Sequence, residues 1–294
     1  MLNALTIDVE DYFQVSAFER HVRRDEWDQY PLRVEGNTYR ILDMLDEFGV
    51  KATFFVLGWV AERCPNLVKD INLCGHEIAC HGYGHELIYQ IGPEKFQKDL
   101  HRAKTVLEDI IGEKVYGYRA PSYSITAKSL WALDILVEEG FSYDSSIFPI
   151  IHDIYGIPGG KRFIHDIKTK SGIIKEFPIS TFPLKIGWWH SRFPIAGGGY
   201  LRLFPAPLIS RAINCINIRE KQPTVVYFHP WEIDPDQPRI RARLKSRFRH
   251  YLNLERMERK IRFLLNNIKF SPMRDIWAQA LIEPNMLEMK RIPI

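Results

Sequence analysis

Short apolar runs alternate with segments of helical periodicity over the first half of the chain. Residues 5–9 and 52–57 are rich in β-branched and aromatic residues and predict two strands, and residues 38–48 between them predict a helix that ends at Gly49. The same alternation predicts helices over 59–73, 93–111 and 126–139 and strands over 77–80 and 115–118. Strands and helices in this order predict an α/β fold with a parallel sheet or barrel.

The second half has weaker periodicity and ends in a basic region. Residues 141–199 predict short strands separated by turns, residues 207–218 predict a helix, and residues 224–228 predict a buried strand that ends directly before His229. Beyond residue 238 the chain is basic, and residues 252–267 predict an amphipathic helix. We therefore expect one barrel-like catalytic domain over residues 1–238 and a basic, partly helical C-terminal extension over 239–294 that packs on it.

Composition narrows the class of protein. With 294 residues, 46% of them hydrophobic, the chain can bury a large core. The net charge of +4 is modest and most basic residues are spread out, so we expect no nucleic-acid partner. The chain shows no signal peptide, no apolar run near the ~20 residues that span a bilayer, and no CxxC pair among its four cysteines. These features predict a cytoplasmic protein whose only membrane contact would be peripheral, at the inner face. They indicate no oligomeric state.

Three carboxylates stand together where the first predicted strand ends. Asp8, Glu10 and Asp11 would repel one another unless a cation or an arginine lay between them, so the cluster indicates a metal site. Strand alternation places Asp8 and Glu10 on one face and Asp11 on the other, if the strand continues that far. Acids in a solvated loop are the simpler alternative for this segment.

Two histidines four residues apart follow the third predicted strand. His81 and His85 could bring two imidazoles to one ion, although their spacing alone is weak evidence. Neither His76-Glu77 nor His85-Glu86 is completed to the HExxH pattern of many zinc hydrolases.

An arginine and a further histidine also follow predicted strands. Arg119 comes directly after the strand over 115–118, and His229 comes directly after the strand over 224–228. Taken singly, Arg119 is an ordinary partner for a surface acid and His229 an ordinary packed histidine. Because the carboxyl ends of parallel strands meet at one face of a sheet or barrel, the acids, the histidine pair, Arg119 and His229 together predict one site.

The residues around these positions resemble the NodB-homology polysaccharide deacetylases, also called carbohydrate esterase family four. The similarity extends over most of residues 4–232, and its most specific part is the stretch 75–85, which is similar to the family's GHEIxxHxxxH motif. The extended motifs at 8–13 and 229–232 are most similar to the subfamily of bacterial exopolysaccharide and exosortase (PEP-CTERM-associated) loci. The other similar motifs lie at 6–8, 53–56, 117–121, 141–146 and 227–229.

This resemblance implies a distorted (β/α) barrel with one divalent metal ion, usually Zn2+, held by a carboxylate and two histidines. The histidines would be His81 and His85. The family has two adjacent aspartates, a base and then a ligand, whereas a valine follows Asp8 here, so the ligand would be Glu10 or Asp11. We favour Glu10 because it shares the strand face with Asp8.

The activity that the resemblance implies is hydrolysis of N-acetyl groups on an acetylated glycan. A metal ion with an open position lowers the pKa of bound water toward ~7 and polarises the acetyl carbonyl. Asp8 would act as the base, Arg119 would pair with it and keep it ionised, and His229 would protonate the sugar nitrogen. Candidates for substrate binding are Pro121, Tyr123 and Trp231.

Two other functions stay open at this level. Cyclic amide hydrolases share this barrel and have similar first motifs, which would make the substrate a ureide or an imide. A catalytically silent carbohydrate-binding or scaffolding protein would keep the fold, but it would not need the base, the ligands, the arginine and the acid together. Peripheral membrane attachment through the basic C-terminal region is compatible with catalysis, and a solvated helix packed on the barrel is the simpler interpretation of that region.

Overall fold

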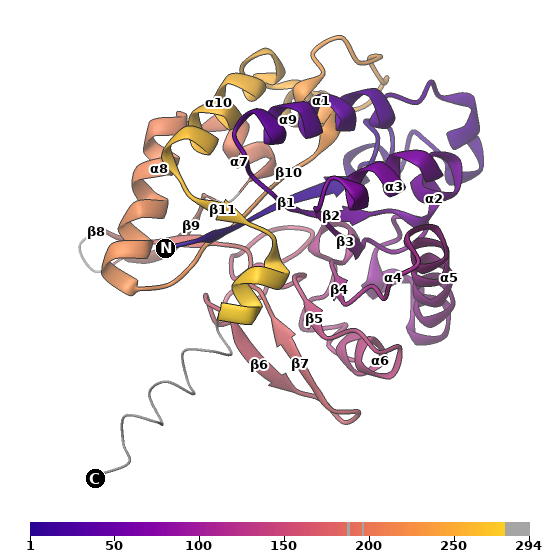
Figure 1. Ribbon diagram of the computed structural model, residues 1–294, viewed down its shortest axis with the longest axis horizontal. Helices are drawn as coiled ribbons and strands as arrows, with labels where there is room; N and C mark the ends of the chain where they lie inside the picture. Colours follow the sequence, from indigo (N-terminus) through magenta and orange to yellow (C-terminus); the bar gives the residue numbers. More distant parts are fainter. Residues whose placement is uncertain (187–188, 196, 280–294) are drawn as a thin grey trace.

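The chain folds around one curled sheet. A computed structural model describes residues 1–186, 189–195 and 197–279. In this part of the chain nine strands form the sheet, in the order β10-β1-β2-β3-β4-β5-β7-β6, with β11 paired to the beginning of β1. The pairs are parallel except for β6 with β7. The result is a mixed α/β fold with a curled half-barrel sheet and helices around it (Figure 1), which confirms the expected α/β barrel type.

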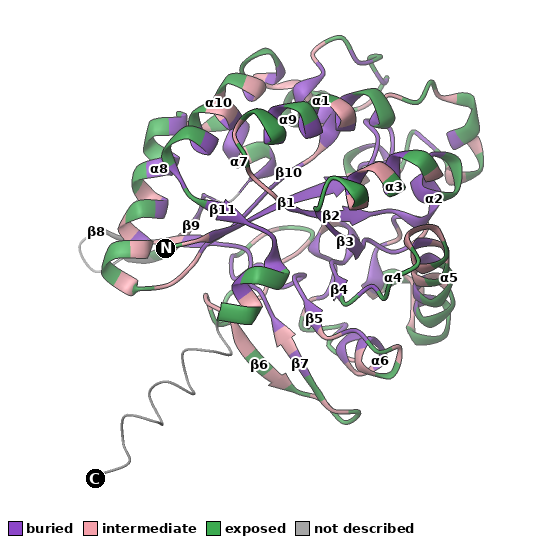
Figure 2. Cartoon of the chain, viewed as in Figure 1, coloured by how far each residue is buried: buried purple, intermediate pink, exposed green. Residues whose placement is uncertain are grey.

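The central strands are buried on both faces (Figure 2), and this explains why their sequences are almost continuously apolar. A separate antiparallel hairpin consists of β8 (Thr181–Ile186) and β9 (Trp189–Pro194). The strands of the main sheet are β1 (Asn3–Val9), β2 (Thr53–Val56), β3 (Glu77–Cys80), β4 (Gly117–Tyr118), β5 (Tyr143–Asp144), β6 (His165–Lys168), β7 (Ile173–Glu176), β10 (Val225–Phe228) and β11 (Phe270–Ser271).

Helices cover the outside of the sheet and bury one face each. The α-helices are α1 (Val34–Glu47), α2 (Gly58–Arg63), α3 (Pro65–Leu73), α4 (Ile88–Ile91), α5 (Pro93–Ile111), α6 (Ala132–Glu138), α7 (Gly198–Leu203), α8 (Ala206–Cys215), α9 (Leu244–Tyr251) and α10 (Leu254–Asn267). Shorter helical turns are η1 (Ser16–Phe18), η2 (Arg24–Gln29), η3 (Pro121–Tyr123), η4 (Ile216–Glu220) and η5 (Pro230–Ile233).

Three predicted helices are wrong in extent. The helix expected over 38–48 begins four residues earlier, at Val34. The helix expected over 59–73 is broken into α2 and α3 at Cys64, whose φ of −125° and ψ of 57° are not helical. The cause is Pro65, which lacks an N–H and disfavours the helical conformation of the residue before it. The helix expected over 126–139 begins only at Ala132, because the hydroxyl of Ser129 bonds the backbone of Thr126 and Ser124 in a turn.

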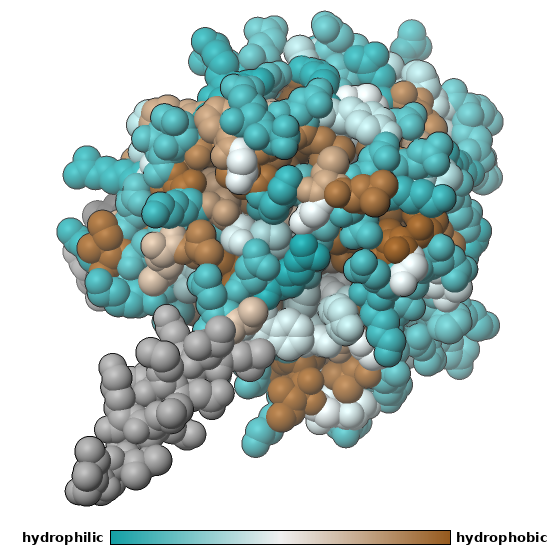
Figure 3. Space-filling view, viewed as in Figure 1, coloured by the Kyte–Doolittle hydropathy of each residue, from teal (hydrophilic) through white to brown (hydrophobic). Residues whose placement is uncertain are grey.

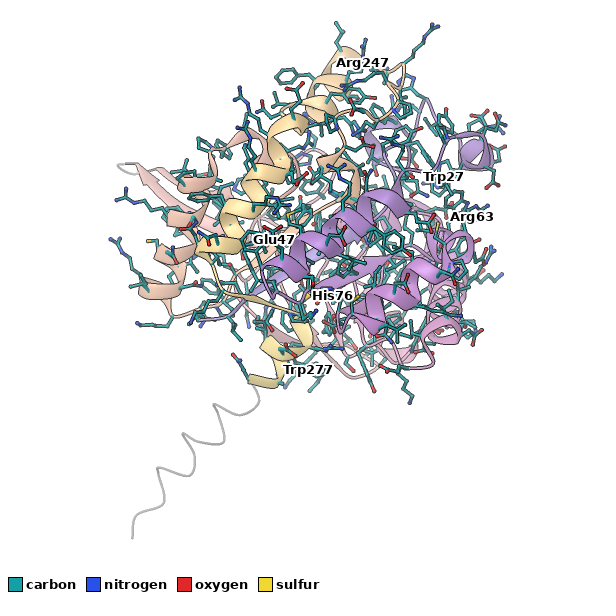
Figure 4. The ribbon with its side chains drawn as sticks, turned by 45° about the horizontal axis from the view of Figure 1, so that its top comes forward. Trp27, Glu47, Arg63, His76, Arg247 and Trp277 are labelled. Carbon is teal, nitrogen blue, oxygen red and sulfur yellow. The ribbon has the colours of Figure 1, made fainter. Side chains whose placement is uncertain are left out.

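The C-terminal region packs on the rest of the fold. The apolar face predicted for α10 is confirmed, since its leucine, methionine and isoleucine side chains are buried. Glu47, at the end of α1, lies beside α10 (Figure 4) and forms an ion pair with Arg262. The domain boundary at residue 238 stays a prediction, and residues 280–294 of the predicted extension lie outside the described residues.

The surface is mostly hydrophilic, with smaller separate hydrophobic patches on the face shown in Figure 3. Among the described residues no helix combines the length and the apolar character needed to cross a membrane. The carboxyl ends of β1, β3, β4 and β10 all open toward one side of the sheet, because these strands are parallel. The predicted site residues follow these four strands.

Candidate active site

Three buried side chains converge at the carboxyl ends of β1 and β3. Glu10 follows β1, and His81 and His85 follow β3; one ligand atom from each lies within 4.8 Å of the others. Each of the three residues is at most 3% exposed. The backbone of His85 has a φ of +50°, a left-handed conformation that turns its ring toward Glu10. The fold thus brings together three of the four residues that the sequence analysis considered as metal ligands.

The geometry of this cluster fits a bound divalent cation. Glu10 Oε2 lies 2.7 Å from His85 Nε2, yet this buried oxygen has no hydrogen-bond partner. His81 Nδ1 donates to the carbonyl oxygen of Arg119 at 2.7 Å, which leaves Nε2 of His81 with a free lone pair. Burial alone would raise the pKa of Glu10, but His85 and His229 lower it well below its usual range. One carboxylate and two imidazoles form a donor set typical of a catalytic Zn2+ site.

Asp11 points away from this cluster and caps α1 instead. Its carboxylate accepts hydrogen bonds from the backbone N–H groups of Tyr12 at 2.8 Å, Arg33 at 2.7 Å and Val34 at 2.8 Å. Burial raises the pKa of Asp11 to about 6, although the three N–H groups oppose the shift. Its oxygens therefore accept hydrogen bonds at the N-terminus of α1.

Asp8 and Arg119 form a buried ion pair next to the cluster. Arg119 Nη1 donates to Asp8 Oδ1 at 2.6 Å and to the Thr6 hydroxyl at 2.7 Å. Its other nitrogens donate to the backbone oxygen of Ser145 at 3.2 Å and to the Ser145 hydroxyl at 2.9 Å. The guanidinium carbon lies 4.1 Å from the centre of the Phe55 ring. Arg119 is therefore held rigidly, and its contact with Oδ1 fixes the position of Asp8, which lines the cleft above the cluster.

His229 faces the cluster from the end of β10. Its Nε2 lies 3.5 Å from Glu10 Oε1 and 3.9 Å from Asp8 Oδ2. Its Nδ1 lies 3.2 Å from Glu232 Oε2, and that oxygen also accepts the backbone N–H of His229 at 3.0 Å. Burial alone would lower the pKa of His229, but Glu10 and Glu232 raise it to about 9.

Glu232 and Arg202 are site residues to which the sequence analysis gave no role. Arg202 Nε donates to Glu232 Oε1 at 2.7 Å, so one carboxylate oxygen of Glu232 accepts from Arg202 while the other contacts His229. Both Glu232 and Arg202 are buried. A signal for Glu232 exists, because a glutamate three residues after a histidine can close a capping box. No local signal identifies Arg202.

The predicted substrate-binding residues differ in where they lie. Trp231 stacks between the rings of His229 and His250, with centroids 5.2 Å and 4.1 Å away, and its Nε1 donates to Glu10 Oε1 at 3.3 Å. Tyr123 lines the cleft, whereas Pro121 is buried at the start of η3.

The backbone is strained at the cleft wall. Ser122 and Tyr123 have φ values of +50° and +54°, which are uncommon for residues other than glycine. Both residues line a cleft of about 670 Å³ over the metal cluster. The cleft also contains Asp8, His229 and Trp231, so base, acid and metal candidates share one solvent-accessible space.

Two family models match the chain. Residues 26–136 match the polysaccharide deacetylase family, and residues 145–278 match a domain of unknown function, DUF3473. The first match contains His81, His85 and Arg119. Glu10 precedes it, and His229 lies within the second match.

Curated relatives match part of the chain. The peptidoglycan deacetylase-like protein FGM2 of Gibberella zeae is 35% identical over 123 residues, 41% of this chain and 36% of that protein. A peptidoglycan-N-acetylglucosamine deacetylase of Bacillus cereus is 31% identical over 120 residues, 37% of this chain and 44% of that protein. The chain therefore spans less than half the length of these relatives. Neither match supports a cyclic amide hydrolase or a silent binding protein.

A solved structure has the same fold over nearly the whole chain. A protein of Mycobacterium smegmatis that has been assigned to the polysaccharide deacetylases superimposes with a TM-score of 0.61 at 20% sequence identity. The alignment covers 96% of this chain and 90% of that one.

Proposed function

We propose that this chain, which carries a polysaccharide deacetylase domain of the NodB and carbohydrate esterase four type, hydrolyses N-acetyl groups of an acetylated glycan with one divalent metal ion. The observation that carries the proposal is the convergence of Glu10, His81 and His85 beside the Asp8–Arg119 pair and His229 in one cleft. Amide hydrolysis requires an activated water, a base and an acid, and these groups can provide them.

Glu10, His81 and His85 would hold the ion, and the donor set favours Zn2+. Glu10 Oε2 supports this assignment because a buried carboxylate oxygen without a hydrogen bond is costly unless a cation offsets its charge. When bound, such an ion lowers the pKa of water and polarises the acetyl carbonyl.

Asp8 and His229 would carry the protons. Asp8 accepts one from the attacking water, since Arg119 occupies only its Oδ1. His229 donates from Nε2 to the sugar nitrogen while Nδ1 donates to Glu232, so the C–N bond breaks to give acetate and a free amine. Water supplies the hydroxyl group that ends in acetate. Pro121 has no N–H, and the N–H groups of Tyr123 and Ser124 already donate to the carbonyl oxygens of Ala120 and Pro121, so the N–H of Ser122 would bind the acetyl oxygen.

The biological setting that we propose is exopolysaccharide synthesis in the cytoplasm or at the inner face of the membrane. The extended motifs at 8–13 and 229–232 support it by their similarity to that subfamily. The structure adds a role for the final glutamate of the second motif, because Glu232 holds both His229 and Arg202.

Two histidine variants test the proposal. His81→Ala should lose both bound metal and activity, whereas His229→Ala should keep the metal and lose ~10²- to 10⁴-fold in turnover. Metal analysis and acetate release from chitotetraose would be measured on both, with His101→Ala as the control because His101 is exposed and pairs with Glu139 outside the cleft. Unchanged turnover in either site variant would contradict the assignment.

A further inference from the structure

The cleft is completed by two segments that do not belong to the sheet. Residues 15–21 around η1 form one part of its wall, and the start of α9 with the residue before it forms another. A side chamber of about 480 Å³ continues from the cleft, and the two share Tyr155, Trp231 and Arg249 among their lining residues.

The rim formed by these segments carries uncompensated positive charge. Arg20, Arg243 and Arg249 line the cleft, are exposed, and have no carboxylate within 4.0 Å in the described part of the chain. Lys245 also lines it, with its Nζ 4.0 Å from an oxygen of the exposed Asp153.

The acids of the cleft do not neutralise this rim, because most of them already have partners. Asp8 is paired with Arg119 and Glu232 with Arg202, and both pairs are buried. Glu19 lies 2.9 Å from Arg24, so its carboxylate is also engaged. A divalent cation at the metal cluster would make the cleft still more positive.

The beginning of α9 adds to the same field. Helix N-termini carry partial positive charge and are normally stabilised by acidic residues. The first turn of α9 has no acidic residue; Arg243 precedes it and Lys245 lies within it. These cations oppose the helix dipole, and a bound anion would offset both.

The side chamber supplies an apolar surface next to these cations. Phe248 lines it and is 67% exposed, and the aromatic rings of Tyr155, Tyr200 and Trp231 line it as well. A few polar groups placed around an aromatic wall are typical of a small-molecule site. A sugar ring could lie on this wall while its acidic group reaches Arg249.

We propose that this rim is a subsite for a negatively charged group of the glycan, a carboxylate or a phosphate, next to the acetylated sugar. The proposal rests on the proposed deacetylase function and names its substrate class: an anionic, N-acetylated glycan of at least two units. Arg249, Arg243 and Arg20 recognise the charge, and Phe248 contacts the neighbouring unit.

Three probes distinguish the sources of the charge. Hyaluronan tetrasaccharide offers carboxylates beside N-acetylglucosamine, UDP-N-acetylglucosamine offers a diphosphate, and chitotetraose is neutral. Binding to the metal-stripped wild-type chain is measured by calorimetry, and KM and kcat for acetate release are measured on the metal-loaded chain. We expect one anionic probe to bind ~10-fold more tightly than chitotetraose at low salt, and this preference to vanish near 1 M salt.

The arginine variants assign the effect to the rim. Arg249→Gln should raise the dissociation constant and KM of the preferred anionic probe ~3- to 5-fold more than it raises those of chitotetraose. Arg247→Gln is the matched control, because Arg247 lies on the same helix, carries the same charge and points outward at the edge of the molecule (Figure 4) without lining the cleft or the side chamber.

Each result decides the proposal. Equal affinity for all three probes, or equal effects of Arg249→Gln and Arg247→Gln, would overturn the anionic subsite even if acetate is released. If no probe yields acetate, the deacetylase function fails separately, while a preference for an anionic probe that depends on Arg249 would still support the subsite.

Discussion

Replacing Glu232 by glutamine perturbs the orientation of His229 without removing a proposed metal ligand. In the wild-type chain Glu232 Oε1 accepts from Arg202 Nε at 2.7 Å, and Oε2 accepts the backbone N–H of His229 at 3.0 Å. In Glu232→Gln the guanidinium of Arg202 keeps the amide oxygen on its side, so the amide NH2 faces His229. The backbone N–H and the ring Nδ1–H of His229 then both meet a donor, so the ring has to lose its Nδ1 proton and keeps only the proton on Nε2.

Glu232→Gln should lower both kcat and the free energy of unfolding. A neutral ring with its proton on Nε2 and an acceptor at Nδ1 is a poor general acid, and general acid catalysis contributes 10²- to 10⁴-fold, so we expect kcat to fall ~10²- to 10³-fold. Arg202 also loses its only carboxylate within 4.0 Å among the described residues, although it keeps the carbonyl oxygen of His250 at 2.6 Å. Breaking a buried pair in this way should lower the free energy of unfolding by ~3 kcal/mol.

The assay combines acetate release from chitotetraose, metal analysis and urea unfolding. Metal content should be unchanged in Glu232→Gln. Glu220→Gln is the matched control, because Glu220 pairs with Arg162 at 3.1 Å and does not line the cleft. A folded, metal-loaded Glu232→Gln protein whose kcat lies within about threefold of wild type would contradict this role of Glu232, since the orienting contact would then contribute under ~1 kcal/mol to catalysis.

Two further predictions concern stability. Asp11→Ala removes the acceptor for N–H groups at the start of α1, so the free energy of unfolding in urea should fall by ~1–2 kcal/mol while the metal content stays unchanged. Glu10→Ala, in contrast, should lose the metal. Loss of metal from Asp11→Ala would exclude Glu10 as the sole carboxylate ligand. Burial lowers the pKa of His76 from 6.5 to about 4, so between these values the unfolded chain binds more protons than the folded chain. Stability should therefore fall by up to ~3 kcal/mol as the pH drops through this window. His76→Gln should flatten that part of the pH profile of urea unfolding while the exposed control His101→Gln does not, and an unchanged slope in His76→Gln would show that another group titrates there.

Elements with local boundary signals could be predicted from the sequence. The helix expected over 93–111 coincides with α5, because Pro93 begins it and Gly112 ends it in a left-handed conformation with a φ of +71°. The strand expected over 77–80 coincides with β3. The break at Cys64 was missed because an apolar stripe continues across it, and periodicity does not register the missing N–H of Pro65.

The candidate site was predictable in part for a similar reason. Strand ends indicate where polar side chains gather, so the gathering of Asp8, His81, Arg119 and His229 at one face could be expected from the order of the elements alone. The choice between Glu10 and Asp11 as metal ligand could not be predicted, because it depends on which of the two carboxylates accepts the N–H groups at the N-terminus of α1.

The α/β alternation, the polar residues at the strand ends and the basic character of the region beyond residue 238 can be predicted from the amino-acid sequence, because each of these is a property of neighbouring positions. The contact of Arg202 with Glu232, and the position of Arg243 and Arg249 at the cleft of Asp8, depend on the three-dimensional fold. Arg202 is far from Glu232 along the chain, and Asp8 is far from Arg243 and Arg249. No local pattern of residues encodes such contacts, because they depend on how helices and loops pack around the sheet.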